Sequence, residues 1–363
     1  MYKGKTIGVV VTAYDESAFV GRVIETVPDF VDRIYVVDDA SPDDSWAVIQ
    51  RVASRMNDRV EPSRAVADGG DSADGEAGRR VMTIRHEENR GYGGAVKTGY
   101  ERASEDGIDV VAVMNGDGQM DPAILDRIID PVATGEADYA KGNRLLHPDD
   151  REGMSSFRLL GNAMLTGLSK FASGYWTIGD PQNGYTAISG ETIEELDLES
   201  ITDQYGFLNH ILTHLNLNGC RVADVSMSAV YGDEESSIRY VPFVRYVSLL
   251  LLQSFLWRLK RRYVLEGFHP TVLFYATGAT GLAGGAFCLL GALGRSLRGK
   301  EGFSGGIAAF VAVLLGLVSL GIAISMDADE SEELEVTYYE YSGEETEIDR
   351  PADRPIEAHQ QLD

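Results

Sequence analysis

Two long uncharged runs near the C-terminal end limit the possible folds of this chain more than any other feature. Residues 272–294 and 305–326 contain 23 and 22 consecutive positions without a charged side chain. Because a bilayer core is crossed by about 20 helical residues, each run is long enough for a transmembrane helix. Their glycines permit the two helices to pack closely. A buried hairpin in a soluble protein is the alternative, but we expect a membrane part over 263–326.

The residues that flank these runs predict how the chain sits in a membrane. Lysine and arginine are enriched in the cytoplasmic segments of membrane proteins. Four basic residues precede the first run and three lie between the runs: Arg258, Lys260, Arg261 and Arg262, then Arg295, Arg298 and Lys300. We therefore expect a multi-pass protein of the cell membrane whose large N-terminal domain faces the cytoplasm.

Three further segments are distinguished by composition. The stretch 241–262 is apolar but short and interrupted by Arg245, which favours an amphipathic helix lying in the membrane interface. The final stretch, 327–363, carries 14 acidic and 2 basic residues and is predicted to be a disordered acidic tail. Residues 61–79 are rich in Gly, Asp and Ala and are predicted to be a flexible insertion.

Composition excludes several classes of protein. The formal net charge of −25 argues against nucleic-acid binding, since a phosphate backbone requires clustered Lys and Arg. Two cysteines, Cys220 and Cys288, cannot form a disulfide framework. The chain has 7 Lys and 25 Arg against 57 Asp and Glu, which suggests the hypothesis of a halophilic source, where salt screens self-repulsion.

The first 240 residues alternate between apolar runs and helix-like patterns, which predicts an α/β domain with a mostly parallel, Rossmann-like, doubly wound sheet. In such sheets ligands bind beyond the carboxyl ends of the strands. The four strand-like runs are Ile7–Val11, Ile34–Val37, Val81–Ile84 and Val110–Met114. The loops that follow them contain the sequences TAYDES, DDASPDDS, NRGYGGAVKTG and NGDGQMDP.

These loops disfavour some ligands. The first loop lacks the glycine fingerprint of a dinucleotide site, and no P-loop is present. His210 and His214 stand four residues apart without an accompanying HExxH motif, so ordinary helix histidines are favoured over a metal site.

Acidic and amide side chains remain at two strand ends. Asp38 and Asp39 follow the second strand, and Asp117, Gln119 and Asp121 follow the fourth. Oxygen ligands at a strand end suit Mg²⁺ or Mn²⁺ shared with the phosphates of a substrate, which predicts a nucleoside diphosphate site. Asp38 or Asp39 could instead accept hydrogen bonds from a base or ribose, and DDASPDDS could simply open a helix.

The ordered sequences AYDE, VDDASPDDS, NRGYGGAVKTG and NGDGQMDP resemble family 2 glycosyltransferases with the GT-A fold. The closest resemblance is to the polyprenyl (dolichyl) phosphate hexosyltransferases typified by dolichyl-phosphate mannose synthase. The resemblance covers about residues 6–240 and implies a GT-A domain over 1–240. It implies a donor that is a UDP- or GDP-hexose, a divalent cation and a polyprenyl phosphate acceptor.

The resemblance also implies roles for the donor-side residues. Tyr14 and Glu16 match a nucleotide-contacting segment, and Asp38 with Asp39 matches the pair that holds the nucleoside. The D-x-D-x-Q segment of the family places the metal at Asp117 and Gln119. Asn115 stands in place of the first Asp and removes one charge beside the diphosphate, although an amide keeps one acceptor oxygen.

On the acceptor side, the resemblance implies that Arg144 meets the acceptor phosphate, with Arg158 as a second basic residue. The segment 180–185 resembles a stretch beside the sugar, and Asp180 is the candidate base if the acceptor is a hydroxyl. The segment 231–239 resembles the Y-G-x-S-K element of the family. Ser237 occupies its lysine position, which leaves Arg239 as the candidate cation.

The resemblance therefore implies a metal-dependent, inverting hexosyltransferase that modifies a lipid phosphate for protein N-glycosylation or surface glycan assembly. Two alternatives remain. One is a family 2 enzyme that extends a glycan on a hydroxyl acceptor. The other is a non-catalytic scaffold that binds nucleotide sugar, suggested by Asn115.

Overall fold

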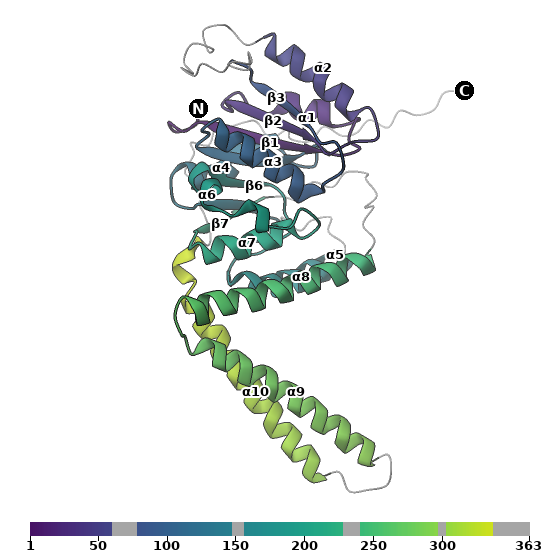
Figure 1. Ribbon diagram of the computed structural model, residues 1–363, viewed down its shortest axis with the longest axis vertical. Coiled ribbons are helices and arrows are strands. Elements are labelled where there is room, and N and C mark those ends of the chain that lie inside the picture. The colour runs from purple at the N-terminus through teal and green to yellow at the C-terminus, as the bar shows by residue number, and fades with distance from the viewer. Residues whose placement is uncertain (60–77, 147–155, 228–239, 297–302, 337–363) are drawn as a thin grey trace, which may run out of the picture.

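The computed structural model describes residues 1–59, 78–146, 156–227, 240–296 and 303–336. These residues form a domain built on one eight-stranded sheet, with a long helical hairpin extending away from it (Figure 1). The strand order is β3-β2-β1-β4-β6-β5-β7-β8. Most of the predicted insertion 61–79, the whole segment 231–239 and residues 337–363 of the predicted tail lie outside the described residues.

The sheet confirms the predicted α/β class with mostly parallel strands. Strand β6 runs antiparallel to both of its neighbours, β4 and β5, and the remaining pairs are parallel. The strands are β1 (Ile7–Ala13), β2 (Arg33–Asp38), β3 (Val81–Arg85), β4 (Val110–Asn115), β5 (Tyr139–Asn143), β6 (Thr186–Ser189), β7 (Val222–Ser226) and β8 (Glu335–Val336).

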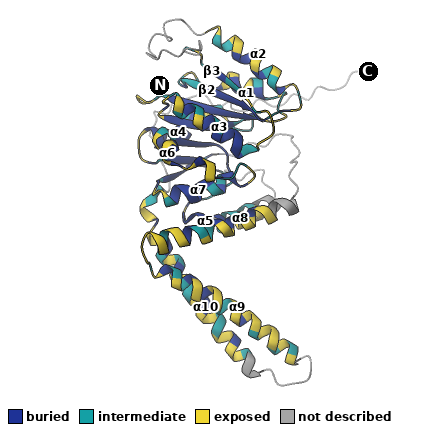
Figure 2. Ribbon diagram, in the orientation of Figure 1, coloured by how far each residue is buried: buried dark blue, intermediate teal, exposed yellow. Residues whose placement is uncertain are grey.

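Helices cover both faces of the sheet, because successive side chains of a strand point to opposite faces. Along β1, Val9 and Val11 pack into the core with α1 (Val20–Thr26), α2 (Ser45–Asn57) and α4 (Leu125–Ala133), whereas Val10 belongs to the opposite core. That second core includes α3 (Tyr92–Glu105), α6 (Gly190–Glu195) and α7 (Phe207–Leu217). The strands are buried between the two layers (Figure 2).

Two long helices form a further layer below the domain, α5 (Ser156–Ser173) and α8 (Tyr240–Lys260). They pack together through Ala172, Val247 and Leu251. Helix α8 covers the segment predicted to be an interfacial helix and continues into a π-helical turn, η4 (Arg261–Leu265). Its position in a membrane interface remains a prediction.

The hairpin consists of α9 (Thr271–Ser296) and α10 (Phe303–Asp329). Among the described residues, two stretches of it are long and apolar enough to cross a membrane, Thr271–Arg295 and Gly306–Asp329, with mean hydropathies of 1.5 and 2.8. The helices touch through glycine, as predicted: a Cβ on Gly281 would lie 2.8 Å from the Cα of Gly316. Large apolar side chains such as Phe287 point outward, 78% exposed.

The segment after α10 corrects the predicted acidic tail. The prediction began the disordered region at residue 327, but residues 327–336 are folded and return to the domain. A short turn, η5 (Glu332–Leu334), leads into β8, which pairs in parallel with β7. The prediction failed because acidic composition alone does not reveal that Asp327 and Glu335 find partners inside the fold.

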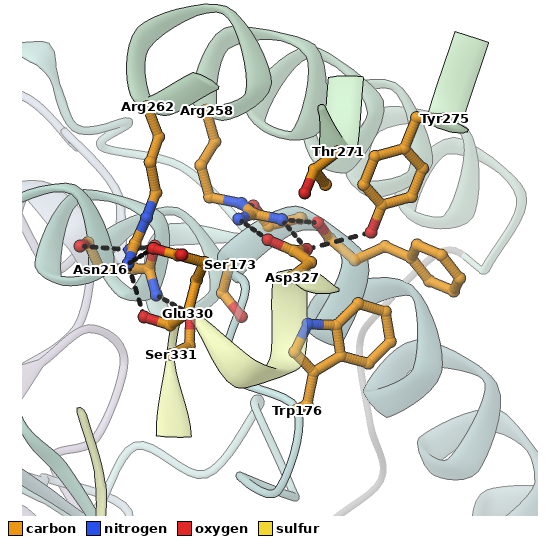
Figure 3. A network of polar contacts seen from close by, with 12 residues as sticks. Ser173, Trp176, Asn216, Arg258, Arg262, Thr271, Tyr275, Asp327, Glu330 and Ser331 are labelled. Atoms are coloured by element: carbon orange, nitrogen blue, oxygen red, sulfur yellow. Dashed lines mark hydrogen bonds and ion pairs between the residues drawn. The ribbon is translucent and has the colours of Figure 1, made fainter. Parts of the chain in front are cut away.

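A buried ion pair joins the end of the hairpin to α8. The guanidinium of Arg258 contacts the carboxylate of Asp327 at 2.7 and 2.8 Å, and both side chains are fully buried. The hydroxyl group of Tyr263 also donates to Asp327. Figure 3 shows the hydroxyl group of Tyr275 donating to Asp327, and Arg262 donating to Asn216 and to the backbone of residue 330. Arg258 is therefore part of the folded core and does not contribute a free charge to the basic flank.

This pair predicts that replacing Arg258 lowers the unfolding free energy much more than replacing the nearby Arg261. Arg258→Met leaves Asp327 buried without its cation, and removing one partner of a buried pair costs about 3–5 kcal/mol of unfolding free energy. Arg261→Met is the control, because Arg261 and its partner Glu266 are exposed and such pairs contribute about 0–1 kcal/mol. Denaturant unfolding in detergent micelles measures both, and equal losses would contradict the assignment.

Candidate active site

The carboxyl ends of β1, β2 and β4 open into a cleft of about 270 Å³. Its position is the one predicted for a ligand of a doubly wound sheet. Five of the predicted site residues lie in its walls. The other lining residues include residues of the loop before α3, of the first turn of α3 and of the loop before α7. The lining is Thr12, Ala13, Tyr14, Glu16, Asp39, Asn89, Gly91, Tyr92, Ala95, Asn115, Gly116, Asp117, Gln204 and Tyr205.

Asp39 fixes one wall of the cleft. Its carboxylate accepts hydrogen bonds from the backbone amides of Arg90 and Gly91, both at 2.8 Å, and lies 2.6 Å from Nδ1 of His86. Gly91 has a φ of 90°, and a Cβ there would lie 2.8 Å from the carbonyl oxygen of Asp203. The glycine sequence after β3 therefore shapes this wall and brings two amides to the aspartate.

Asp38 is directed elsewhere, which corrects the prediction that the two aspartates act as a pair. Its side chain is fully buried, does not line the cleft, and lies 3.1 Å from Nε of Arg85. Neighbouring residues at a strand end face opposite sides of the sheet, so one aspartate can face the cleft while the other faces away. The structure leaves Asp39 as the candidate nucleoside ligand.

The loop after β1 is held by side chains of the DDASPDDS sequence. Backbone amides of residues 15, 16 and 17 donate to Ser41, Ser45 and Asp43 at 3.2, 2.9 and 3.0 Å. Helix α1 begins after this supported loop, at Val20. Helix α2 begins at Ser45, so the sequence both opens a helix and supports Tyr14 and Glu16 in the cleft.

Asn115, Asp117 and Gln119 form a tight loop at the end of β4. The amide of Gln119 donates to Oδ1 of Asp117 at 2.9 Å, and Gly118 between them has a φ of 73°. Oδ1 of Asn115 is buried, and no hydrogen-bond partner for it exists among the described residues. Asp121, which also follows β4, caps the short helix η1 (Pro122–Ile124) by accepting from the amide of Ala123.

The chemistry of this loop fits a divalent cation. Hard cations prefer oxygen ligands, and the loop offers the Asp117 carboxylate beside the unpaired buried oxygen of Asn115. No group of three or more His, Cys, Asp or Glu capable of holding a metal occurs in the described part of the chain. A cation here would therefore be held by Asp117, Gln119 and Asn115, with the rest of its coordination supplied by substrate oxygens or water.

Arg144 and Asp180 form a two-pronged ion pair. Nε and Nη2 of Arg144 donate to the two carboxylate oxygens of Asp180 at 2.7 and 3.0 Å, and the Arg144 amide donates at 3.1 Å. Asp180 is 1% exposed and adopts a left-handed backbone with a φ of 40°. Burial raises the pKa of its carboxyl, but the hydrogen bonds and charge of Arg144 together with the charge of Lys141 lower that pKa by more, so it lies below its usual value.

The loop that carries Asp180 also reaches the cleft. The hydroxyl of Tyr92, a cleft residue, donates to the carbonyl oxygen of Gly184 at 3.5 Å. A Cβ on Gly184 would lie 3.5 Å from Oδ1 of Asn115. Residues 180–184 therefore connect the Arg144 pair with the cleft wall.

Two predicted basic residues cannot be placed as side chains. Arg158 lies in the first turn of α5, but its side chain is outside the described part of the structure, as is the whole of Arg239 with the segment 231–239. Their acceptor-phosphate roles remain predictions from the resemblance.

The sequence interpretation missed Asp224. Its buried carboxylate accepts from Nζ of Lys141 at 3.1 Å, Nδ2 of Asn143 at 2.6 Å and the amide of Gly179 at 2.7 Å. It thereby holds the end of β5, next to Arg144, against the loop that carries Asp180. An acidic residue inside the otherwise apolar strand VADVS was the available signal.

His210 and His214 both lie in α7, and the ring of His210 is engaged by a backbone amide. Nδ1 of His210 accepts from the amide of Thr202 at 3.1 Å, which places the ring proton on Nε2 and removes the lone pair a metal would need there. Burial lowers the pKa of both His210 and His214 to about 4, so both rings are neutral near pH 7.

The glycosyl transferase family 2 model matches residues 8–196, more than half of the chain. This chain belongs to glycosyl transferase family 2. The matched region runs from the second residue of β1 through β6, and it includes the cleft residues from Thr12 to Asp117 and the Arg144 pair. Membership confirms the resemblance stated from the motifs.

Similar family 2 proteins differ from one another in the sugar that they transfer. A UDP-N-acetylglucosamine–dolichyl-phosphate N-acetylglucosaminyltransferase of Methanococcus voltae is 25% identical over 62% of this chain and 86% of its own length. A polyprenol monophosphomannose synthase of Mycolicibacterium smegmatis is 27% identical over 61% of this chain and 76% of its own length.

Solved structures also match. A glucosyl-3-phosphoglycerate synthase of Mycobacterium tuberculosis, crystallised with Mn²⁺, uridine diphosphate and phosphoglyceric acid, is 20% identical, with a TM-score of 0.44. The match covers 70% of this chain and 78% of that one.

The Asp117 loop of this family 2 domain predicts pH-dependent cation binding. Burial raises the pKa of the Asp117 carboxyl, so it takes up a proton at a higher pH than an ordinary aspartate. Because a metal ligand must be deprotonated, Mn²⁺ affinity should fall as the pH drops through that pKa. Asp117→Asn should weaken Mn²⁺ binding about ten-fold or more in the presence of a nucleoside diphosphate.

Calorimetric titration with Mn²⁺ between pH 5 and 8 measures this effect. Asp121→Asn is the control, since Asp121 lies in the same loop but is exposed and caps η1. Equal affinities of the two variants would contradict the cation assignment.

Proposed function

We propose that this family 2 enzyme transfers a hexose from a nucleoside diphosphate sugar to a polyprenyl phosphate at a membrane surface. The observation that carries the proposal is the loop 180–184, which orients Arg144 at one end and borders the donor cleft at Tyr92 and Asn115 at the other. In the proposed function, this arrangement would put the guanidinium of Arg144 beside the donor sugar. Arg144 is 27% exposed and can meet an acceptor phosphate.

The state of Asp180 favours a phosphate acceptor over a hydroxyl acceptor. A hydroxyl must lose a proton to a base, but the Asp180 carboxylate is almost completely buried and its pKa is lowered by Arg144. A lowered pKa makes it a weak base. A phosphate monoester, whose second pKa is about 6, is already an anionic nucleophile near pH 7 and needs no base.

On the donor side, Asp39 and Tyr14 would contact the nucleoside, and Asp117, with Gln119 and Asn115, would hold Mg²⁺ or Mn²⁺. The bound cation would neutralise the charge that develops on the departing diphosphate. Arg144 would align the acceptor for a single in-line displacement, which inverts the anomeric configuration.

The outer surface of α5 and α8 suits a lipid acceptor. Several large apolar side chains on these two helices are about half exposed or more: Met164, Leu168, Leu249, Leu252 and Leu256. Exposed apolar surface of this kind marks a contact with lipid or protein. Together with α9 and α10, it would place the domain at the surface where a polyprenyl phosphate presents its headgroup.

The cytoplasmic orientation remains a prediction. With Arg258 buried in its ion pair, three basic residues remain before α9, equal to the three between the helices. Sealed vesicles test the orientation directly: added nucleotide sugar should be used without permeabilisation only when the cytoplasmic face is outside.

The function is tested with membranes that contain the full chain, labelled UDP- or GDP-hexoses, polyprenyl phosphate and Mn²⁺ or Mg²⁺, at molar salt. We expect a labelled lipid that mild acid hydrolyses, because a sugar phosphodiester is acid-labile and a glycoside is much less so. Asp117→Asn should lose at least about 99% of this activity, as expected when a charge-stabilising group is removed. An acid-stable product would support the hydroxyl-acceptor alternative.

Asn115→Asp separates an enzyme from a scaffold. In an active enzyme the amide already supplies one acceptor oxygen, so the variant should change the rate by less than about ten-fold. Turnover that emerges only in the variant, from an inactive parent, would instead support a nucleotide-sugar-binding scaffold. The rate of formation of labelled lipid measures both outcomes.

A further inference from the structure

The loop before Asp180 is held by a part of the chain that lies beyond the membrane helices. Residues 174–180, the Asp180 loop, connect the end of α5 to the Arg144 pair. Glu335, in β8, accepts hydrogen bonds from the amide of Trp176 and from both the amide, at 2.7 Å, and the hydroxyl of Thr177. The carboxylate therefore serves three donors of two adjacent residues that are 158 or more positions away in sequence.

Residues 327–336, which follow the hairpin, are also connected to the chain just before the Asp180 loop. The Arg258 guanidinium that pairs with Asp327 also donates to the carbonyl oxygens of Phe171 and Ala172, at 3.1 Å each, in the last turn of α5. Figure 3 shows the side chain of Arg258, a residue of α8, extending to Asp327 near the end of α10. Residues 327–336 thus contact the middle of the Asp180 loop directly, through Glu335, and are connected to the chain immediately before that loop through Arg258.

The backbone at Asp180 requires such support. A φ of 40° is uncommon for a residue with a side chain, and it persists where surrounding contacts hold it. Asp224 and Lys141 hold Gly179 from within the domain, through its amide and its carbonyl oxygen. Glu335 holds the preceding residues, so Asp180 lies at the end of a loop fixed along its length.

We propose that Glu335 is a positioning residue for the acceptor: it fixes the Asp180 loop, and through Asp180 it orients the guanidinium of Arg144 toward the acceptor phosphate. The inference deepens the proposed function and rests on the acceptor role of Arg144. In this arrangement, the segment that follows the apolar hairpin is connected through Glu335 and Asp180 to the residue that binds the acceptor. The chain that leaves α10 completes the sheet with β8 and, in doing so, sets the geometry of the acceptor side of the site.

This connection predicts a selective kinetic effect. Glu335 contacts neither the Asp39 wall nor the Asp117 loop through any hydrogen bond found among the described residues, so donor binding should be preserved. In Glu335→Ala, the KM for polyprenyl phosphate should rise about ten-fold while the KM for the nucleotide sugar changes less than about two-fold. Glu335→Gln keeps one acceptor oxygen and should give an intermediate KM.

The experiment uses the full chain in lipid nanodiscs and measures initial rates against both substrates, with hydrogen exchange at residues 174–180. The control is Glu333→Ala, which removes an exposed glutamate two residues away and should change neither KM. Thr177→Val provides a second variant, which removes one hydrogen-bond donor to Glu335. Because the side chain of Thr177 is exposed, the variant should remain folded and should raise the acceptor KM by about two- to three-fold.

The outcomes separate this inference from the proposed function. Faster exchange in the Asp180 loop together with a raised acceptor KM supports the positioning role. An unchanged acceptor KM in Glu335→Ala, with an active wild type, overturns that role and leaves the proposed function intact. An equal rise in the KM for both substrates also overturns it, since that pattern indicates a general structural effect. A wild type that transfers to no lipid phosphate contradicts the proposed function itself.

Discussion

The site depends on one geometric constraint, the meeting of parallel strand ends at a single edge of the sheet. Strands β2, β1 and β4 are adjacent and parallel, so the loops that follow them converge although they are separated by up to about 100 residues in the chain. This convergence brings Tyr14, Asp39 and Asp117 into the walls of one cleft. The antiparallel β6 then leads away from the loop that carries Asp180, which borders this cleft from the other side.

Within this frame, carboxylates do most of the positioning. Asp39 draws two backbone amides toward the cleft, Asp180 aligns a guanidinium, and Asp224 holds two strand residues and the amide of Gly179. A buried carboxylate is costly unless several donors surround it, and each of these has at least three. The acid-rich composition thus has an internal structural use in addition to its effect on the surface.

The apolar hairpin of α9 and α10 is integrated with the domain instead of being attached as a separate unit. The ion pair between Arg258 and Asp327 buries two opposite charges at the base of the hairpin, and β8 adds a strand after it. Removal of one charge would leave the other uncompensated in the core. In the proposed function, this rigid connection would keep the acceptor side of the site at a fixed height above the lipid.

The sequence by itself determined the fold class, the two apolar helices, the family and the loops that form the cleft, because these depend on local run lengths, periodicity and motif order. It could not decide that Asp39 and not Asp38 faces the cleft, or that Asp180 forms an ion pair with Arg144. It also could not decide that Asp224 holds the loop that carries Asp180. It also mistook the residues around Asp327 and Glu335 for a disordered tail. These features were decided by the tertiary structure, since each depends on a contact across the sheet or between segments far apart in the chain, and the partner that decides whether a charge is buried or solvated leaves no local pattern.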